Sequence, residues 1–307
     1  MRLSRLQELT DLCVCAQSFI AQGKVLVDGQ PVTKAGTKLA DDPSKPGQVV
    51  LTAEVPRYVS RAGLKLEAAL EAFPDLAHAV ARGAVALDSG LSTGGFSDCL
   101  RQYGASRVYG VDVGYGQVAE KVRRDEGVII MERTNLRYLM QGVDEPCDVA
   151  TIDLSFIGVR KCMPAICAAL KGVPVSEGGD GSSAGEEAAE AAEAAHLAVL
   201  IKPQFEAGKA RLGKGGVVRD EATRQEIMRE VAASVEVFGF ELRGVVDSPV
   251  AGRKEGNVEF LAHFLRTRRP SEEAQKEIDE AVEAAKIHAA VESARAAGQG
   301  GGRQARR

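Results

Sequence analysis

The sequence has no tryptophan and little histidine or cysteine, with 4 His and 6 Cys among its 307 residues. The cysteines are dispersed and form no CxxC pair. A zinc site needs closely spaced Cys and His ligands, and a disulfide-stabilised domain needs many more cysteines for its size. The sequence therefore disfavours any metal site and indicates reduced thiols in an intracellular compartment. The cysteines are Cys13, Cys15, Cys99, Cys147, Cys162 and Cys167.

Long apolar runs are also missing. No stretch approaches the roughly 18 apolar residues that a membrane-spanning helix requires, so neither a spanning protein nor a membrane partner is expected. Residues near Met1 show no clear signal or transit peptide. We therefore expect a cytoplasmic protein, or one from a plastid or mitochondrion if the source is eukaryotic. The length predicts about two domains.

Basic residues are not in excess, since the formal net charge is −4. Taken alone, this charge argues against a nucleic-acid partner. The charge is unevenly distributed, however: residues 172–195 contain six acidic residues and no basic one, and the rest of the chain carries +2. This segment is rich in Gly, Ser, Ala and Glu and has no apolar face to bury, which predicts a solvated insertion. The distribution of charge permits an RNA partner without demonstrating one.

Short apolar runs alternate with helical patterns through most of the chain. Strands are predicted at 84–88, 107–112, 128–131, 148–153 and 196–202, and helices at 94–104, 118–125, 157–170 and 219–239. This alternation predicts an α/β fold with a doubly wound, mostly parallel sheet. The last two predicted strands, at 240–248 and 257–265, have no helix between them. They should form an antiparallel hairpin at one edge of the sheet.

The two ends of the chain differ from this central part. Residues 1–55 predict a small α+β module, with a hairpin turn at Asp28-Gly29. Residues 56–66 would form a linker and the start of the larger domain, which continues over 67–270. Residues 271–307 predict a helix capped by Ser271, followed by a glycine-rich tail.

The first strand of the larger domain leads into a glycine-rich loop and then a helix, in the segment LDSGLSTGGF. Glycines permit tight turns and close ligand approach, but the spacing is neither GxGxxG nor a P-loop with its lysine. The next strand ends at Asp112, where an acid can reach ribose hydroxyls. Adenosine without phosphates fits this pattern, which suggests S-adenosylmethionine; alternatively, the loop merely packs. The candidate cofactor-binding residues are Asp88, Gly90, Ser92, Thr93, Gly94, Gly95, Phe96 and Asp112.

Charged residues end two further strands. Asp153 follows the fourth apolar run and Lys202 the fifth, so both should face the crevice at the carboxyl ends of the strands. Such a pair can order a hydroxyl and lower its proton affinity or that of the lysine, or it can be a salt bridge at the sheet rim. Glu259 lies within an apolar strand and needs a partner. Lys65 is a candidate for that partner.

These residues lie in blocks that resemble the TlyA family. The blocks include YVSRAGLKLEAAL, LDSGLSTGGFSDCLRQYGASRVYGVDVGYGQ, MERTNLRYL, TIDLSFIGVRKCMPAI, LIKPQFEAGK, GGVVRD and SPVAGRKEGNVEFLAHF. They span roughly residues 20–266 in collinear order, apart from the insertion. The resemblance implies a Rossmann-like, FtsJ-like methyltransferase domain behind an RNA-binding domain of the ribosomal-protein alpha-L type. Family members are ribosomal RNA 2′-O-methyltransferases that act on cytidines, and they also carry a historical haemolysin label.

The resemblance also implies a catalytic Lys-Asp-Lys-Glu tetrad, which falls on Lys65, Asp153, Lys202 and Glu259. The tetrad would orient the ribose 2′-hydroxyl toward the methyl group of S-adenosylmethionine, with no metal. Lys202, held by Asp153, would accept or relay the proton. The implied partners are ribosomal RNA and ribosomal subunits, bound by a monomer or weak oligomer. Expected RNA contacts are Lys24, Lys34, Lys38 and Arg61.

Two departures from the family pattern leave other functions open. Leu91 stands where the family more often has alanine, a change that can crowd the methionine moiety without preventing its binding. The stretch near Leu12 and Cys13 lacks the family's longer first helix and its Ser-Arg pair. One alternative is therefore a catalytically impaired, ribosome-associated RNA-binding factor. A membrane-lytic protein is a second alternative, but no membrane segment or strongly amphipathic cationic helix supports it.

Overall fold

The computed structural model describes residues 19–37, 49–52, 56–139, 143–173, 194–250 and 257–300. Several predictions from the sequence lie outside these residues. They concern the first helix with Leu12 and Cys13, the RNA contact Lys38, most of the insertion at 172–195 and the end of the glycine-rich tail.

A three-stranded antiparallel sheet is the first of two sheets, in the order β2-β1-β3. Its strands are β1 (Val25–Val27), β2 (Gln30–Val32) and β3 (Val49–Leu51). Asp28 and Gly29 join β1 to β2 with φ angles of +51° and +79°, as a two-residue hairpin turn requires. The predicted turn is therefore confirmed. Ile20 and Val25 form a small core beneath the sheet.

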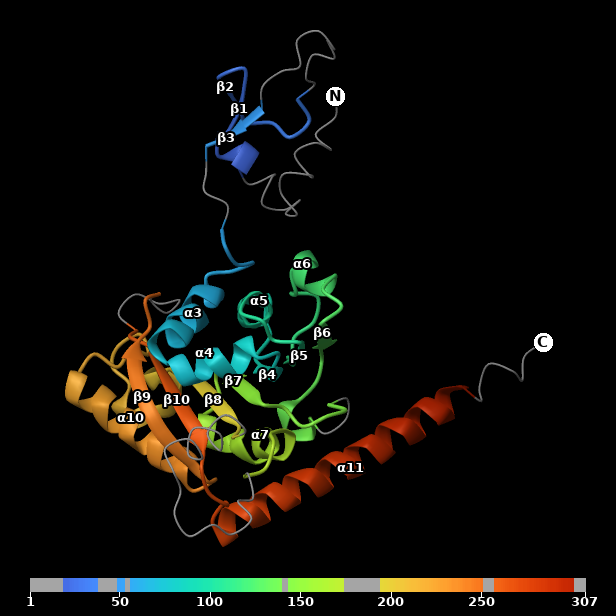
Figure 1. The fold of residues 1–307 in the computed structure, drawn as a ribbon, viewed down its shortest axis with the longest axis vertical. Helices are drawn as coiled ribbons and strands as arrows, with labels where there is room; N and C mark the ends of the chain where they lie inside the picture. Colours follow the sequence, from blue (N-terminus) through green and yellow to red (C-terminus); the bar gives the residue numbers. More distant parts are fainter. Residues whose placement is uncertain are drawn as a thin grey trace.

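The second sheet has seven strands in the order β6-β5-β4-β7-β8-β10-β9 (Figure 1). The strands are β4 (Val85–Ser89), β5 (Arg107–Val111), β6 (Val128–Met131), β7 (Val149–Ile152), β8 (His196–Ile201), β9 (Phe240–Asp247) and β10 (Phe260–Arg266). Strands β4 to β8 are parallel, and β10 runs antiparallel to both β8 and β9. The predicted doubly wound sheet with an antiparallel hairpin at its edge is confirmed.

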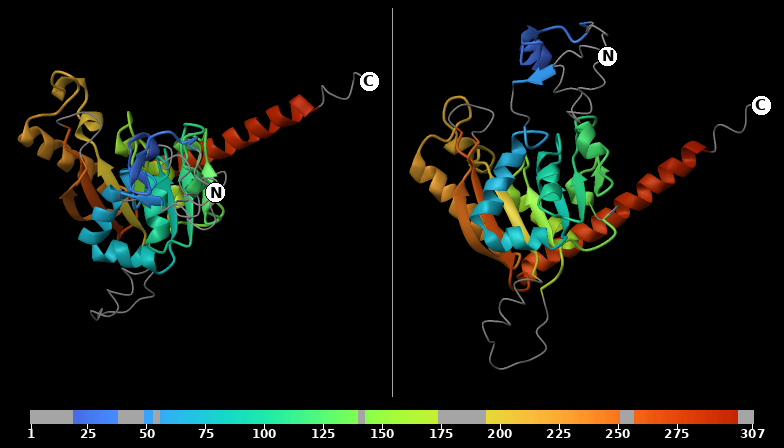
Figure 2. Two further views of the ribbon diagram at one scale, coloured as in Figure 1. Left: turned by 90° about the horizontal axis from the view of Figure 1, so that it is seen from above. Right: turned by 45° about the horizontal axis from the view of Figure 1, so that its top comes forward.

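Helices cover both faces of this sheet (Figures 1 and 2). The helices are α3 (Ala62–Ala72), α4 (Pro74–Ala81), α5 (Gly95–Gln102), α6 (Glu120–Arg123), α7 (Met163–Ala169), α9 (Pro203–Glu206), α10 (Glu221–Glu236) and α11 (Glu272–Gly300), with 3-10 turns η1 (Leu136–Tyr138), η2 (Val159–Lys161) and η3 (Lys209–Arg211). Leu66, Leu76 and Leu100 pack helices α3 to α5 on one face. Met163 and Ile227 pack helices α7 and α10 on the other, beside the start of α11.

The helices depart from the predicted pattern in three places. The helix expected at 118–125 is shortened to α6, which begins at Glu120 because Ala119 has an extended backbone (φ −62°, ψ +143°). The helix expected at 157–170 is split into η2 and α7, and Pro164, which has no N–H, lies in the first turn of α7. Helices α3 and α4 were not singled out by any pattern. Helix α10 has a side-chain cap, since Asp220 accepts the Thr223 N–H at 2.7 Å.

Helix α11 begins on the body of the protein and extends away from it (Figure 1). Ser271 caps its first turn, as predicted, by accepting the Ala274 N–H at 3.2 Å. A bidentate ion pair helps to attach it: Arg160 Nη1 and Nη2 donate to Glu277 Oε2 and Oε1 at 2.7 and 2.6 Å. Among the residues the structure describes, neither α11 nor any other helix combines the length and apolarity needed to cross a membrane.

Candidate active site

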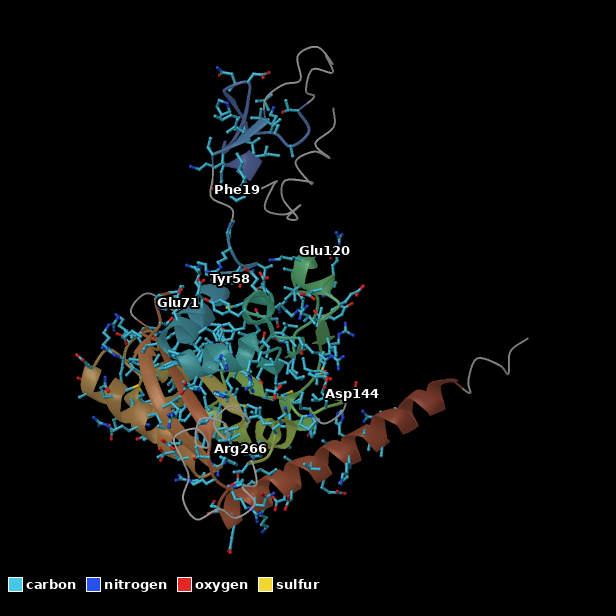
Figure 3. The ribbon with its side chains drawn as sticks, viewed as in Figure 1. Phe19, Tyr58, Glu71, Glu120, Asp144 and Arg266 are labelled. Carbon is cyan, nitrogen blue, oxygen red and sulfur yellow. The ribbon has the colours of Figure 1, made fainter. Side chains whose placement is uncertain are left out.

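The carboxyl ends of the parallel strands meet at one edge of the large sheet. Figure 3 shows Tyr58 and Glu120 at this edge and Arg266 at the opposite one. Ligands of open α/β sheets bind outside the carboxyl ends of the strands, because the loops there can splay apart. This edge also carries the four residues expected to form the tetrad.

Asp153 and Lys202 form an ion pair at the ends of neighbouring strands. Asp153 follows β7 and Lys202 follows β8, with 2.5 Å between Lys202 Nζ and Asp153 Oδ1. The Lys202 side chain is only 10% exposed and the Asp153 side chain 16%. Lys202 Nζ also donates to Ser155 Oγ at 3.3 Å. The ammonium is thereby restrained from two sides within a partly desolvated site.

Lys65 and Glu259 form a second ion pair beside the first. Lys65 on α3 donates to Glu259 Oε2 at 2.5 Å, and Glu259 is 4% exposed. The expectation that a lysine compensates this buried carboxylate is confirmed. Phe260 pairs with Ile201 in the antiparallel β8–β10 ladder. One step further along this ladder, Glu259 lies opposite Lys202. The structure therefore brings the two pairs to one sheet edge.

The glycines of the loop after β4 are required by packing within the chain. Gly90 has φ +101°, and a Cβ there would overlap the carbonyl oxygen of Asp153. Gly94 has φ +90°, and its Cβ would lie 2.9 Å from Val122. A Cβ on Gly95 would overlap Ser60 Oγ. Close packing, the alternative to a ligand, thus accounts for the glycines themselves.

Asp112 is the residue of this region best placed to meet a ligand. Its side chain is half-buried at the end of β5, and its carboxylate accepts the Ser92 N–H at 2.8 Å and the Gly114 N–H at 2.7 Å. Further lone pairs remain on both oxygens for hydroxyl donors. In the first turn of the neighbouring helix α5, the Ser97 N–H is already bonded to the Asp88 carboxylate. The remaining acceptor capacity of Asp112 fits the ribose hydroxyls of S-adenosylmethionine.

Asp88 lies beneath the loop and does not line it. It is completely buried and accepts hydrogen bonds from Ser97 Oγ at 2.6 Å and Thr151 Oγ1 at 3.2 Å. Burial raises the pKa of its carboxyl to about 6, against the hydrogen bond from Ser97, which lowers it. In this structure Asp88 supports the loop from below.

Two apolar residues of the same segment also point into the core. Phe96 is 3% exposed and packs among the residues of α3 and α5. The Leu91 side chain is 2% exposed and packs against Gly110 of β5. The expectation that Leu91 crowds the methionine moiety is therefore wrong, because glycine at 110 leaves space for the leucine within the core. Ser92 and Thr93 are half-buried in the loop between these residues and α5.

The expected RNA contacts lie in two different places. Lys24 and Lys34 are exposed in the region of the small sheet. Arg61 is exposed immediately before α3, the helix that carries Lys65. Arg61 therefore belongs to the edge with the ion pairs.

Two aromatic residues at this edge were not predicted as functional. Phe156 is 90% exposed and has a φ of +67°, and its ring lies 5.0 Å from that of Phe205. Phe156 stands three positions after Asp153 in DLSF, and Phe205 three positions after Lys202 in KPQF. A phenylalanine three positions after each charged strand end is the sequence pattern that could have indicated these two residues.

The described residues contain neither a cluster of metal ligands nor an exposed thiol. No group of three or more His, Cys, Asp or Glu side chains in that part of the chain could hold a metal ion. The described cysteines are all buried, and burial raises the thiol pKa to about 12 for Cys99, Cys147 and Cys167 and to about 11 for Cys162. Such thiols are poor nucleophiles at neutral pH.

The large sheet with helices on both faces is a Rossmann-like fold. Residues 58–266 match the FtsJ-like methyltransferase family. The Mycobacterium tuberculosis protein named 16S/23S rRNA (cytidine-2′-O)-methyltransferase TlyA is 37% identical over 270 residues, covering 87% of this chain and 89% of that protein. Hemolysin A of Brachyspira hyodysenteriae is 34% identical over 252 residues, covering 81% of this chain and 92% of that protein.

A solved structure is similar over nearly the whole chain. It is named "Putative hemolysin from Streptococcus thermophilus", and the match has a TM-score of 0.60 and 31% identity, covering 95% of this chain and 98% of that one. This chain therefore belongs to the FtsJ-like methyltransferase family, in the group that includes TlyA and hemolysin A.

Proposed function

We propose that this protein methylates the ribose 2′-hydroxyl of cytidine in ribosomal RNA, with S-adenosylmethionine as methyl donor. The observation that carries the proposal is the Lys202–Asp153 ion pair at the carboxyl edge of the sheet, with Lys65–Glu259 beside it. The name of the M. tuberculosis relative supports the substrate class.

The residues that would hold the donor are those of the loop after β4 and the end of β5. Asp112 would accept hydrogen bonds from the ribose hydroxyls, and the loop over residues 90–95 would lie against the rest of the molecule. S-adenosylmethionine supplies a methyl group on a sulfonium, which is a good leaving group. The task left to the protein is to align and desolvate the hydroxyl oxygen.

Lys202 is the proposed catalytic base or proton relay. Its Nζ would bond the 2′-hydroxyl oxygen and stabilise the negative charge that develops there. Because an ammonium has no lone pair, Lys202 Nζ would first pass a proton to the Asp153 carboxylate, and the resulting amine would then accept the 2′-hydroxyl proton. Ser155 restrains the same ammonium. The Lys65–Glu259 pair would maintain the position of Lys202 through the β8–β10 register.

The exposed ring of Phe156 supports a nucleotide substrate. RNA-modifying proteins stack unpaired bases on aromatic rings, and each stacked base contributes about 1–3 kcal/mol. Phe156 presents such a ring at the mouth of the site, backed by Phe205. A base stacked there would place its ribose near Lys202.

The N-terminal part of the chain would serve RNA binding, and the larger domain would carry out catalysis. Residues 1–55 would form an RNA-binding domain in which Lys24 and Lys34 contact phosphates, with Arg61 adding a contact near the site. Residues 67–270 would form the catalytic domain. The partners would be ribosomal RNA and ribosomal subunits, met in the cytoplasm by a monomer or weak oligomer.

Methyl transfer from labelled S-adenosylmethionine tests this function directly. The purified protein is incubated with small subunits, large subunits and naked rRNA, and the labelled nucleoside is identified after digestion. We expect 2′-O-methylcytidine, and comparison of rRNA from cells with and without the protein would map its position. A label on a base, or no transfer while calorimetry shows cofactor and RNA binding, would contradict the proposal. A liposome-leakage assay tests the lytic alternative separately.

A further inference from the structure

We propose that Glu206 is a positioning residue that holds the loop of residues 155–159, and with it Phe156, at a set distance from the Lys202–Asp153 pair. The inference rests on the proposed function for its effect on catalysis. Its structural part, the restraint of the loop by Glu206, can be tested without any activity.

Glu206 contacts the loop through its carboxylate. It ends α9, the short helix that begins directly after Lys202. Its Oε1 accepts the Val159 N–H at 2.9 Å. A Cβ on Gly158 would lie 2.9 Å from Oε2, so a larger residue there would make the carboxylate shift. Gly158 therefore leaves the space that the Glu206 carboxylate occupies.

The loop needs such a restraint because it is strained and exposed. A φ of +67° costs a bulky residue such as Phe156 about 1–3 kcal/mol, and a side chain that is 90% exposed recovers little of this by burial. The conformation must therefore be held by contacts of the neighbouring residues and of the ring.

Three side-chain contacts to this strained turn come from one segment, KPQFE at 202–206. Lys202 Nζ donates to Ser155 Oγ at 3.3 Å, and the Phe205 ring lies 5.0 Å from that of Phe156. Glu206 completes the set at Val159. The segment that supplies the proposed base thus also holds the aromatic ring proposed to stack the base of the substrate.

Stability alone does not explain a carboxyl group at this position. Burial raises the pKa of Glu206, and the Val159 N–H opposes this shift. No Lys, Arg or His among the described residues lies within ion-pair distance of it. Glu206 is half-buried, and a carboxyl without a cation there is costly, so its hydrogen bond to the loop accounts for an acceptor at this position better than a role in stability.

The absence of tryptophan from the chain provides a specific reporter. Phe156→Trp introduces a single fluorophore into the loop, and Glu206→Ala, Glu206→Gln and Gly158→Ala are compared in that background. We expect Glu206→Ala and Gly158→Ala to raise acrylamide quenching and lower the anisotropy of the introduced tryptophan. Glu206→Gln keeps an acceptor for the Val159 N–H and should behave like the parent. Glu241→Ala, at an exposed position on β9, is the control.

Kinetics in the chain that retains Phe156 test the catalytic consequence. Misplacing a reacting group by about 1 Å can lower a rate about 100-fold, so we expect Glu206→Ala to lower kcat/KM for RNA by about 10- to 100-fold. The Kd for S-adenosylmethionine should not change, and Glu206→Gln should restore the rate. Equal losses in the Ala and Gln variants, or an unchanged fluorescence signal in both Glu206→Ala and Gly158→Ala, would overturn the inference. If the unsubstituted protein methylates no rRNA, the proposed function fails while the fluorescence comparison still decides the restraint.

Discussion

Lys65 and Glu259 lie near opposite ends of the FtsJ-like region, yet their side chains meet at 2.5 Å within the protein. The contact joins helix α3 to the start of β10, next to the position of Lys202 in the β8–β10 register. One ion pair therefore links the stability of this sheet edge to the geometry proposed for catalysis. The two contributions can be separated by substitution.

Glu259→Ala leaves the Lys65 ammonium unpaired in a largely buried position. We expect the free energy of unfolding, measured by urea denaturation, to fall by about 3 kcal/mol. Removing both charges in Lys65→Met/Glu259→Leu should recover most of that loss but not methylation. Glu120→Ala, which breaks the exposed pair with Arg124, should cost less than about 0.5 kcal/mol. A double variant with full activity would show that the pair only stabilises the fold.

Lys202→Ala should abolish most of the activity without loss of fold or cofactor. Removal of a group that transfers a proton typically lowers the rate about 10²- to 10⁴-fold. Lys209→Ala, an exposed lysine in the following turn, is the matched control and should keep the parent rate. Single-turnover methylation of rRNA and calorimetry with S-adenosylmethionine supply the two measurements. Full methylation of the same nucleotide by Lys202→Ala would refute the assigned role.

Gly90→Ala should disturb both stability and activity. The added methyl group would overlap the backbone carbonyl of Asp153, in addition to a positive φ that costs about 1–2 kcal/mol. Gly116→Ala is the control, because Gly116 also has a positive φ, +71°, but no atom lies within 4 Å of its Cβ position. Thermal unfolding of the two variants should differ, with Gly90→Ala the less stable. Equal melting temperatures would mean that the loop relaxes freely away from Asp153.

Protonation of His263 should weaken the fold in acid. Burial, with smaller contributions from His196 and Arg243, lowers the pKa of His263 from 6.5 to about 3. The unfolded chain therefore binds more protons between these values, and the free energy of unfolding falls as pH drops below 6.5, by at most about 1.4 kcal/mol per pH unit from this group. Asp88, whose pKa is raised to about 6, acts in the opposite sense.

The difference between the parent and His263→Gln isolates the histidine contribution, because Asp88 is common to both. Urea denaturation at pH 7, 6, 5 and 4 should show a shallower decline for His263→Gln. Its stability at pH 7 should be lower, since the 3.0 Å contact of the His263 ring with His196 is lost. Parallel pH profiles for the two proteins would contradict the assignment.

Local patterns in the sequence predicted much of the fold. Every predicted strand of the large sheet is present within two or three residues, because buried parallel strands are short apolar runs bounded by turns. The Asp28-Gly29 turn and the Ser271 cap were also predicted correctly, since each depends on a local backbone conformation. The division of the helices was less predictable: the extended backbone at Ala119 delays the start of one of them.

The candidate site shows where local pattern is insufficient. The residue types at 65, 153, 202 and 259 identified the site through their resemblance to a family, but only the sheet register and the position of α3 bring the pairs together. The glycines after β4 suggested a ligand, whereas the structure explains them by contacts with Asp153, Val122 and Ser60. Phe156 and Glu206 drew no attention in the sequence.

Strands, turns and the charged residues at the strand ends could be predicted from local patterns, because they depend on neighbours along the chain. Which of those charges meet, which glycines serve packing and which aromatic ring remains exposed depend on the folded arrangement. Burial and ion pairing join residues that are distant in the chain, so no local pattern specifies them. A carboxylate such as Glu206 acquires its contact with Val159 only when the strands β7 and β8 lie side by side.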